Sequence, residues 1–377
     1  MPVLPTLSPE GHARAEVLAA GVQPPELKAT PRPSSDGSSS TPALSFRIES
    51  LKGWHLPLLD DPGFLPLQPL LQKAFLLAMP ERLLAVVAPR RPLAPSVLVA
   101  LHDNRQRRSQ ALGLIAYQRI NRTGTCWQVC HLRTAHSSLD DPCTPARSAV
   151  ATSLLKEAIQ SVTGAASWIA TASSLDPSRL ALLREQGFQP LRTDRLWRWN
   201  PRGEAPQSLR PAVPPELQLR PLTRRNAALL WHLEQATCPA QLRQLLDRRV
   251  EDLQDQSDGR GWLLIDPCRN EAVAGIRWLE DHPGGGDQVQ FSLHPGWQHL
   301  LGPATETLLQ RFGSRSGRSL WLLSDVGDRP LQQWFERIGA DGHGEEVLMA
   351  RSVWRRQEPT PARRAVRRLA AVLDQLQ

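Results

Sequence analysis

One succession of expected strands and helices occurs twice in this chain of 377 residues. The order is strand, two helices, three strands, helix, strand, helix, strand, and each copy spans roughly 150 residues. Between the copies lies Asn200–Pro215, which holds five prolines and is typical of a stiff linker. We therefore expect two related domains at residues 44–200 and 217–356, joined by a linker at 201–216.

Hydrophobic periodicity gives the elements of each copy. In the first copy, strands are predicted at 44–49, 96–102, 111–120, 126–135, 167–172 and 192–199, and helices at 65–79, 80–89, 145–162 and 177–186. In the second copy, strands are predicted at 217–221, 261–265, 271–280, 288–294, 320–324 and 345–354, and helices at 223–237, 239–254, 303–312 and 330–338.

The spacing of glycines supports a duplication. Gly113 and Gly275 each fall inside a third strand and are 162 residues apart. Gly187 and Gly339 each end a late helix and are 152 residues apart. The difference of ten residues fits a longer loop, residues 135–144, in the first copy.

The two ends of the chain differ from the middle in composition. Residues 1–43 are rich in Pro, Ser, Ala and Gly and are expected to be disordered, because they cannot bury enough apolar surface. Residues 357–377 are expected to form a basic helix. Of the net charge of +8, the stretch Arg351–Arg368 carries +6, from seven arginines and one acid. Because this charge lies on a tail and not on a folded face, a nucleic-acid reader is not expected. The tail helix is expected to dock on the protein, to contact an acidic partner or to lie on a membrane surface.

Other features narrow the class of protein. No stretch has the roughly 20 apolar residues of a spanning helix, and no secretory signal is recognised, so a cytoplasmic location is expected. The five cysteines are expected to be cytosolic thiols. Cys126 and Cys130, which precede His131, are about 13 Å apart on a strand, too far to share one zinc ion. No metal site is expected.

Two segments carry a family resemblance. The first reads Asp176-x-x-Arg179-x-x-Leu182-Leu183-x-x-x-Gly187-Phe188, and the second reads Asp328-x-x-Leu331-x-x-Trp334-Phe335-x-x-x-Gly339-Ala340. Both resemble the Asn-x-x-Ala-x-x-Leu-Tyr-x-x-x-Gly-Phe motif of the GCN5-related N-acetyltransferase (GNAT) family. The resemblance covers residues 44–200 and 217–355. It implies an α/β fold of two tandem GNAT-like domains, each a twisted mixed β-sheet flanked by helices.

The resemblance also implies where acyl-CoA binds. In the family, the thioester arm lies in a V-shaped gap between the fourth and fifth strands. The pyrophosphate lies at the N-terminus of the following helix, where free N–H groups and the helix dipole favour an anion. In the first copy these positions are Leu132, Arg133 and Thr134 on the strand, and Arg147, Ser148, Ala149, Val150, Ala151 and Thr152 on the helix.

Loop chemistry favours the first copy as the acetyl-CoA site. Ala149 and Ala151 place small residues where the family has glycines. In the second copy, Gln298 suits the first motif position, but Leu301 and Pro303 stand where glycines are expected, and Pro303 lacks an N–H donor.

The sequence assigns no catalytic residue. Leu183 and Phe335 replace the motif tyrosine, and the one tyrosine of the chain, Tyr117, lies on a different strand. Carboxylates or imidazoles that could accept a proton from an amine are His131 in the first copy and Glu280, Asp281 and Asp287 in the second. None of them has a distinctive spacing.

The expected function is transfer of an acetyl group from acetyl-CoA, as co-substrate, to an amine that the sequence does not identify. The alternative is a non-catalytic GNAT-fold binding module in which one or both clefts are degenerate, as the lost glycines and tyrosines suggest. A third hypothesis is a nucleic-acid or ribosome-associated protein that uses the arginine tail. It predicts steep salt dependence that disappears when 357–377 is deleted.

Overall fold

The computed structural model describes residues 46–84, 95–102, 110–135, 146–201, 213–257 and 259–352, with the backbone alone for 77–84. The predicted disorder of 1–43, the predicted helix at 357–377 and most of the linker 201–216 lie outside these residues. None of the helices in the described ranges combines the length and the apolar character that crossing a bilayer requires.

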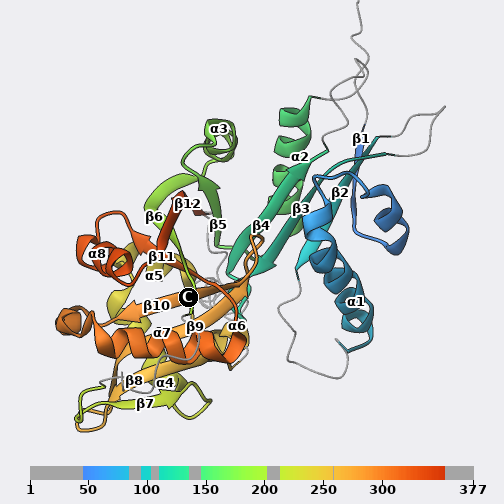
Figure 1. Ribbon diagram of the computed structural model, residues 1–377. Helices are drawn as coiled ribbons and strands as arrows, with labels where there is room; N and C mark the ends of the chain where they lie inside the picture. Colours follow the sequence, from blue (N-terminus) through green and yellow to red (C-terminus); the bar gives the residue numbers. More distant parts are fainter. Residues whose placement is uncertain are drawn as a thin grey trace, which may run out of the picture. The chain divides into compact units, whose positions relative to one another are not determined.

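The chain alternates strands and helices in the order that the repeat predicts (Figure 1). The elements of the first half are β1 Phe46–Ser50, η1 Gly53–Leu58, η2 Leu65–Leu67, α1 Gln68–Leu84, β2 Ser96–His102, β3 Gln110–Arg119, β4 Cys126–Thr134, α2 Arg147–Ser161, β5 Ser167–Ser173, α3 Pro177–Glu185 and β6 Gln189–Trp199. Those of the second half are β7 Gln218–Pro221, α4 Ala227–Thr237, α5 Ala240–Leu246, α6 Val250–Ser257, β8 Gly261–Asp266, β9 Glu271–Asp281, β10 Asp287–Leu293, η4 Pro295–Leu300, α7 Pro303–Ser316, β11 Leu320–Asp325, α8 Arg329–Arg337 and β12 Asp341–Ser352.

The strands of the described ranges form one 12-stranded sheet in the order β1-β2-β3-β4-β5-β12-β6-β11-β10-β9-β8-β7. The pairs β4–β5 and β10–β11 are parallel, and the other neighbours are antiparallel. The predicted α/β class with mixed strands in each half is thus confirmed. The two sheets that the sequence suggests are joined edge to edge into one.

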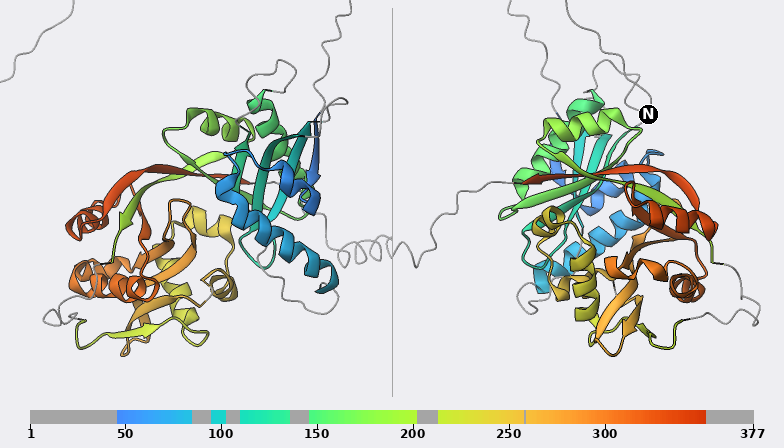
Figure 2. Two further views of the ribbon diagram at one scale, coloured as in Figure 1. Left: turned by 45° about the vertical axis from the view of Figure 1, so that its right-hand side comes forward. Right: turned by 90° about the vertical axis from the view of Figure 1, so that its left-hand side faces the viewer.

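The last strands of the two halves are exchanged. The strand predicted at 192–199 is present as part of β6, but it does not complete the sheet of the expected domain 44–200, because β6 pairs with β11 of the second half and not with β5. In return, β12 pairs with β5 of the first half. The two exchanged strands also pair with each other, and Figure 2 shows the red strand β12 running beside the green strand β6. Each half therefore depends on the other to complete its sheet.

Helices cover both faces of the sheet, and alternate strand residues face them. In the first half, α2 and α3 bury Leu154 and Leu183 against one face, and α1 buries Leu71 against the other. In the second half, α7 and α8 contribute to one core, and α4 and α6 to another. The tryptophans of β6, Trp197 and Trp199, belong to the second-half core, as the strand exchange requires.

Three details differ from the sequence prediction. Residues 65–89 were expected to form two helices, whereas one helix, α1, runs through Pro80 to Leu84. Conversely, the single helix expected at 239–254 is two helices, α5 and α6. The chain breaks at Asp247, which takes a left-handed conformation with φ of 43°.

The third difference concerns the glycine pairs. A side chain at Gly113 would meet Val150 and Leu154 of α2, whereas one at Gly275 would meet Leu230 and Leu233 of α4. Because α2 corresponds to α7 in element order and α4 packs on the opposite face, these two glycines are not equivalent. Gly187 and Gly339 are equivalent, since both follow a helix of the same order and have φ values of 81° and 79°.

Candidate functional site

The parallel strand pair of each half separates partway along its length. Between β4 and β5 the pairing runs from Cys126 to Val129, which leaves Cys130–Thr134 without a β5 partner. Between β10 and β11 it covers only Asp287 and Gln288, which leaves Val289–Leu293 parted from β11. In each half, the end of one strand therefore makes no backbone pairing with the neighbouring parallel strand.

The residues predicted for acyl-CoA lie around the first of these gaps. Leu132, Arg133 and Thr134 end β4, and Arg147 to Thr152 begin α2. Val150 and Ala151 are buried in the first-half core, whereas Ser148 and Ala149 are exposed. The structure thus brings the two predicted segments to the same half.

An arginine that the sequence analysis names in the first motif, but not among the site residues, spans the first gap. Arg179 lies in the first turn of α3, and its Nη1 donates a hydrogen bond to the carbonyl oxygen of Leu132 at 3.0 Å. Burial lowers the pKa of Arg179, and the neighbouring Arg133 lowers it further, whereas Asp176 and Glu346 oppose that effect. The guanidinium therefore occupies a backbone acceptor on the parted segment of β4.

The second gap opens into a cavity of about 310 Å³. Its walls come from β10, from β11 and the start of α8, from η4, from α4 and α5, and from the exchanged strand β6. Phe291, Ser292 and Leu293, the last three residues of β10, line it; they correspond in position to Leu132–Thr134 of β4. At the motif position of Arg179, the second half has Leu331, which also lines the cavity.

The first half supplies two charged residues to this cavity through β6. Asp194 is only 6% exposed, and Arg192 Nε donates to its carboxylate at 3.0 Å. Burial raises the pKa of Asp194, Arg192 opposes that effect, and Asp325 adds to it. The cavity thus holds a buried carboxylate whose affinity for a proton is greater than that of an ordinary aspartate.

The same spacing of 152 residues separates Asp194 from Glu346 on β12. The two residues stand directly opposite each other in the β6–β12 pair, so they are related by the pseudo-twofold symmetry of the exchange. Burial raises the pKa of Glu346, the nearby Asp194 raises it further, and Arg179 lowers it. Each half therefore receives an acidic side chain from the last strand of the other.

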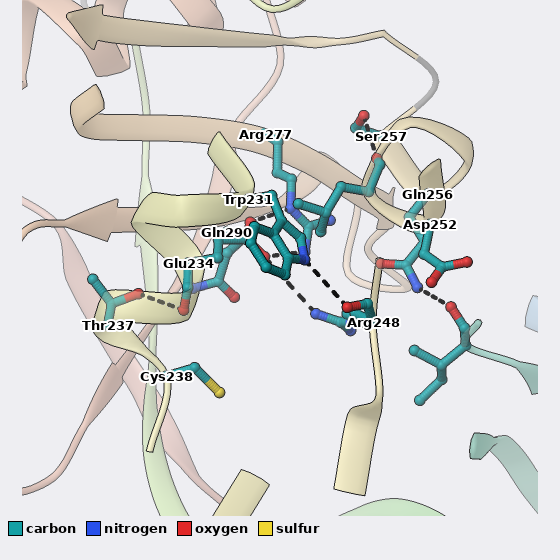
Figure 3. Close-up of polar contacts among 12 residues, drawn as sticks. Trp231, Glu234, Thr237, Cys238, Arg248, Asp252, Gln256, Ser257, Arg277 and Gln290 are labelled. Carbon is teal, nitrogen blue, oxygen red and sulfur yellow. Dashed lines mark hydrogen bonds and ion pairs between the residues drawn. The ribbon is translucent and has the colours of Figure 1, made fainter. Parts of the chain in front are cut away.

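A network of arginines borders the cavity where the chain breaks between α5 and α6 (Figure 3). Glu234 of α4 accepts from Nε and from Nη2 of Arg277, the second at 3.2 Å. Arg248 follows the break at Asp247, and its Nη1 is 3.9 Å from Glu234. Burial lowers the pKa of Arg248, and so does the neighbouring Arg277. Two arginines thus share one carboxylate.

The first half holds the backbone that carries Arg248. Asn121, in the turn between β3 and β4, is fully buried and donates from Nδ2 to the carbonyls of Leu246 and Asp247 at 3.0 and 3.3 Å. Asp252 accepts from the backbone N–H groups of Arg122 and Arg249, both at 2.7 Å. These bonds fix the short loop between α5 and α6 to the opposite half.

The residues that the sequence suggested for proton transfer lie elsewhere. Asp281 and Asp287 both accept hydrogen bonds from Arg318, at 2.7 and 3.1 Å, and neither they nor Glu280 line the cavity. Burial lowers the pKa of His131 to about 4, and Arg133 and Arg179 contribute to that effect. The imidazole is therefore neutral near pH 7.

Tyr117 also belongs to a core and not to a gap. Its hydroxyl lies 3.0 Å from Ser161 Oγ, and its ring packs against Trp127 and Trp168. No sequence pattern indicates that Arg192 and Asp194 line the second-half cavity, since both residues precede the linker. Both residues lie in the last strand of the first repeat. They could have been assigned to the second-half cavity only if the exchange of last strands had also been known.

Solved structures with a similar fold include a GCN5-related N-acetyltransferase from Sphaerobacter thermophilus, with a TM-score of 0.51 at 11% identity, over 82% of this chain and 96% of that one. A putative acetyltransferase from Pyrococcus horikoshii has a TM-score of 0.49 at 8% identity, over 82% and 90%. A tandem GNAT protein from the clavulanic acid biosynthesis pathway, solved without acetyl-CoA, has 0.48 at 13%, over 82% and 98%.

No protein-family model matches the sequence, and no curated protein matches it. At 11% identity, the likeness to the Sphaerobacter thermophilus protein shows the fold alone. The chain has the GNAT fold.

Proposed function

We propose that this protein is an acyltransferase that moves an acyl group, with acetyl expected, from acyl-CoA to an amine in the second-half cavity. The observation that carries the proposal is the cavity itself, which opens where β10 and β11 part. In the fold family, the thioester arm lies in that gap. Phe291–Leu293 line the cavity and have no β11 partner. The Phe291 carbonyl accepts from Gln290 Nε2 at 3.1 Å, so the amides of a pantetheine arm would use the other backbone groups of this segment or displace that side-chain amide.

The residues of the cavity fit direct attack by the amine. The amine nitrogen bonds to the thioester carbon, the carbon–sulfur bond breaks, and the thiolate of CoA leaves. The ammonium form of the amine must first lose a proton, and Asp194 is the buried carboxylate available to accept it. Phe335 stands at the motif tyrosine position and is fully buried, so the proton that finally neutralises the thiolate comes from another group or from water.

We assign the first half a supporting and non-catalytic role. Arg179 crosses its gap to the carbonyl of Leu132, which is the group that would otherwise face the ligand. The first half instead supplies β6 with Asp194, and Asn121 with its hydrogen bonds to the α5–α6 loop. Binding of acetyl-CoA at Leu132–Thr134 and Arg147–Thr152 is the competing prediction from the sequence.

Titration calorimetry with acetyl-CoA tests the assignment through a matched pair of variants. Leu331→Arg gives the second gap an arginine at the position that Arg179 occupies in the first. We expect this change to weaken acetyl-CoA binding more than tenfold. Arg179→Leu makes the reverse change in the first half and should leave the affinity unaltered. Absence of heat with the wild-type protein at millimolar acetyl-CoA would exclude the catalytic function.

Ala149→Trp examines the first-half site directly. Ala149 is exposed at the start of α2, so the larger side chain is tolerated and thermal melting should be unchanged. If Ala149→Trp abolishes acetyl-CoA binding while Leu331→Arg retains it, the cofactor site lies in the first half and the present assignment is wrong.

A further inference from the structure

Among the arginines around the second-half cavity, Arg248 lacks a carboxylate of its own. Arg192 is held by Asp194 at 3.0 Å and lies 4.0 Å from Asp325. Glu234 is held by two hydrogen bonds from Arg277. Within the part of the chain that the structure describes, the ion pair of Arg248 is the long contact of 3.9 Å to that same carboxylate.

Arg248 also has unsatisfied donors. Its Nε is buried without a hydrogen-bond partner in the described part of the chain, and so is Nη1 of Arg277. The side chain of Arg248 is 22% exposed and lines the cavity. A partly buried guanidinium whose Nε is withdrawn from water and lacks a dedicated anion destabilises a folded protein. A ligand that supplies the anion explains why the site retains it.

We infer that the Arg248 guanidinium binds a carboxylate on the acceptor, so that the acceptor is a small amine that also carries a carboxylate, as an amino acid does. The planar fork of arginine donors matches the two oxygens of a carboxylate. This inference rests on the proposed function, and it names the class of the amine.

The position of Arg248 separates it from the CoA side of the cavity. Arg248 lies on the loop beyond α5, next to the wall formed by α4 and α5, whereas η4 and the start of α8 form another wall. In the fold family the pyrophosphate lies by the helix after the fourth strand, here α7. Asp194 and Asp325, which line the same cavity, complement the ammonium end of such an acceptor.

The loop that carries Arg248 is held in place before any ligand arrives. Asn121 binds the carbonyls of Leu246 and Asp247, and Trp231 Nε1 donates to the carbonyl of Arg248 itself at 3.2 Å (Figure 3). Fixing the backbone in advance reduces the entropy lost when the guanidinium binds its anion.

Calorimetric binding of the twenty proteinogenic amino acids, each compared with its amide, tests the inference without acyl-CoA present. We expect at least one acid to bind and its amide to bind about 10- to 100-fold more weakly, the range of a charge-assisted hydrogen bond. Arg248→Gln should abolish that discrimination. Arg248→Lys keeps the charge beside Glu234 and loses the fork, so it should fold and bind at intermediate strength.

Arg249→Gln is the matched control, because the neighbouring Arg249 is exposed, and it should bind as the wild type does. Two results would overturn the inference: no amino acid binding at millimolar concentration, or equal binding of acid and amide. The inference would also be wrong if the Arg248→Gln protein lost affinity for acetyl-CoA but kept its preference for the acid over the amide. In that case the anion would be a CoA phosphate.

The two proposals fail separately. A protein that binds amino acids through Arg248 but produces no heat with acetyl-CoA would refute the acyltransferase function and retain the carboxylate site. A protein that binds acetyl-CoA but does not distinguish acids from amides would refute the carboxylate site and retain the acyltransferase function.

Discussion

At the scale of single residues, the two halves differ at one position in the first turn of the motif helix, which is Arg179 in α3 and Leu331 in α8. Arg179 reaches the carbonyl of Leu132 and fills a polar position in the first gap, whereas Leu331 leaves the second gap lined by an apolar side chain. The acidic residues, in contrast, are alike in the two halves. Asp194 and Glu346 are equivalents that face each other across the β6–β12 pair, so the difference between the gaps does not come from the acids.

The role of Asp194 as base predicts a matched result for these two acids. Asp194→Asn should lower kcat by about 100-fold or more, the usual contribution of a positioned base, and Glu346→Gln should lower it little. Because the base acts as a carboxylate and burial raises its pKa, activity should fall as pH decreases, beginning above the range where an ordinary aspartate titrates. Steady-state kinetics with pH profiles measure both effects.

Asp194→Glu restores a carboxylate and should recover part of the rate together with the acidic limb. Thermal melts of all three variants show whether each one folds. Loss of activity in Glu346→Gln with full activity in Asp194→Asn would place the chemistry in the first half.

At the scale of elements, β6 is the strand on which the architecture depends. Trp197 Nε1 donates to Ser324 Oγ of β11 at 2.8 Å, and its ring packs against Phe335 of α8 with centroids 5.8 Å apart. The break at Asp247 is the other decisive element, because it turns one predicted helix into two and places Arg248 at the cavity. Both features bring together segments that are distant in sequence.

A double-mutant cycle between Trp197 and Phe335 tests the strand exchange in solution. Trp197→Ala should lower the free energy of unfolding by about 3–5 kcal/mol, as expected for a buried aromatic. Combined with Phe335→Ala, it should show a coupling of about 0.5–1.5 kcal/mol. Urea denaturation supplies both values.

Trp54→Ala serves as the control for this cycle, since Trp54 is 47% exposed and its loss should change stability by about 0.5 kcal/mol or less. Additive effects of Trp197→Ala and Phe335→Ala would mean that the two rings do not touch, and that β6 closes its own half.

At the scale of the whole molecule, the exchange makes the two halves one folding unit. Without β12, β5 has a neighbouring strand on its β4 side alone, and without β6, β11 has one on its β10 side alone. Exposed sheet edges of this kind promote association and aggregation. Each half therefore supplies a strand that the other half needs, whatever its own cleft binds.

Separate production of fragments 1–207 and 208–377 tests this dependence. Each fragment alone is expected to aggregate or to lack a cooperative melt, whereas co-production should give a 1:1 complex that binds acetyl-CoA. Size-exclusion chromatography and circular dichroism give the result. A monomeric 1–207 fragment that melts cooperatively would show that β6 can fold back onto β5 and that the exchange is dispensable.

The sequence by itself determined what local chemistry controls. Asp176 and Asp328, the first residues of the two motifs, each accept a hydrogen bond from the backbone N–H three residues later and so cap α3 and α8. Gly187 and Gly339 take the positive φ that follows each of these helices. Strand and helix order follow from hydrophobic periodicity, and so the duplicated α/β pattern was predictable.

The tertiary structure alone decided which strands pair and which gap forms a cavity. A strand offers the same backbone donors and acceptors to any neighbour, so nothing within 192–199 specifies β11 over β5. The hydrogen bond from Arg179 to Leu132 joins residues 47 positions apart. The cavity is lined both by Asp194 and by Glu234 and Arg248, which follow it by 40 and 54 positions. Such contacts depend on how whole elements pack, which no local pattern contains.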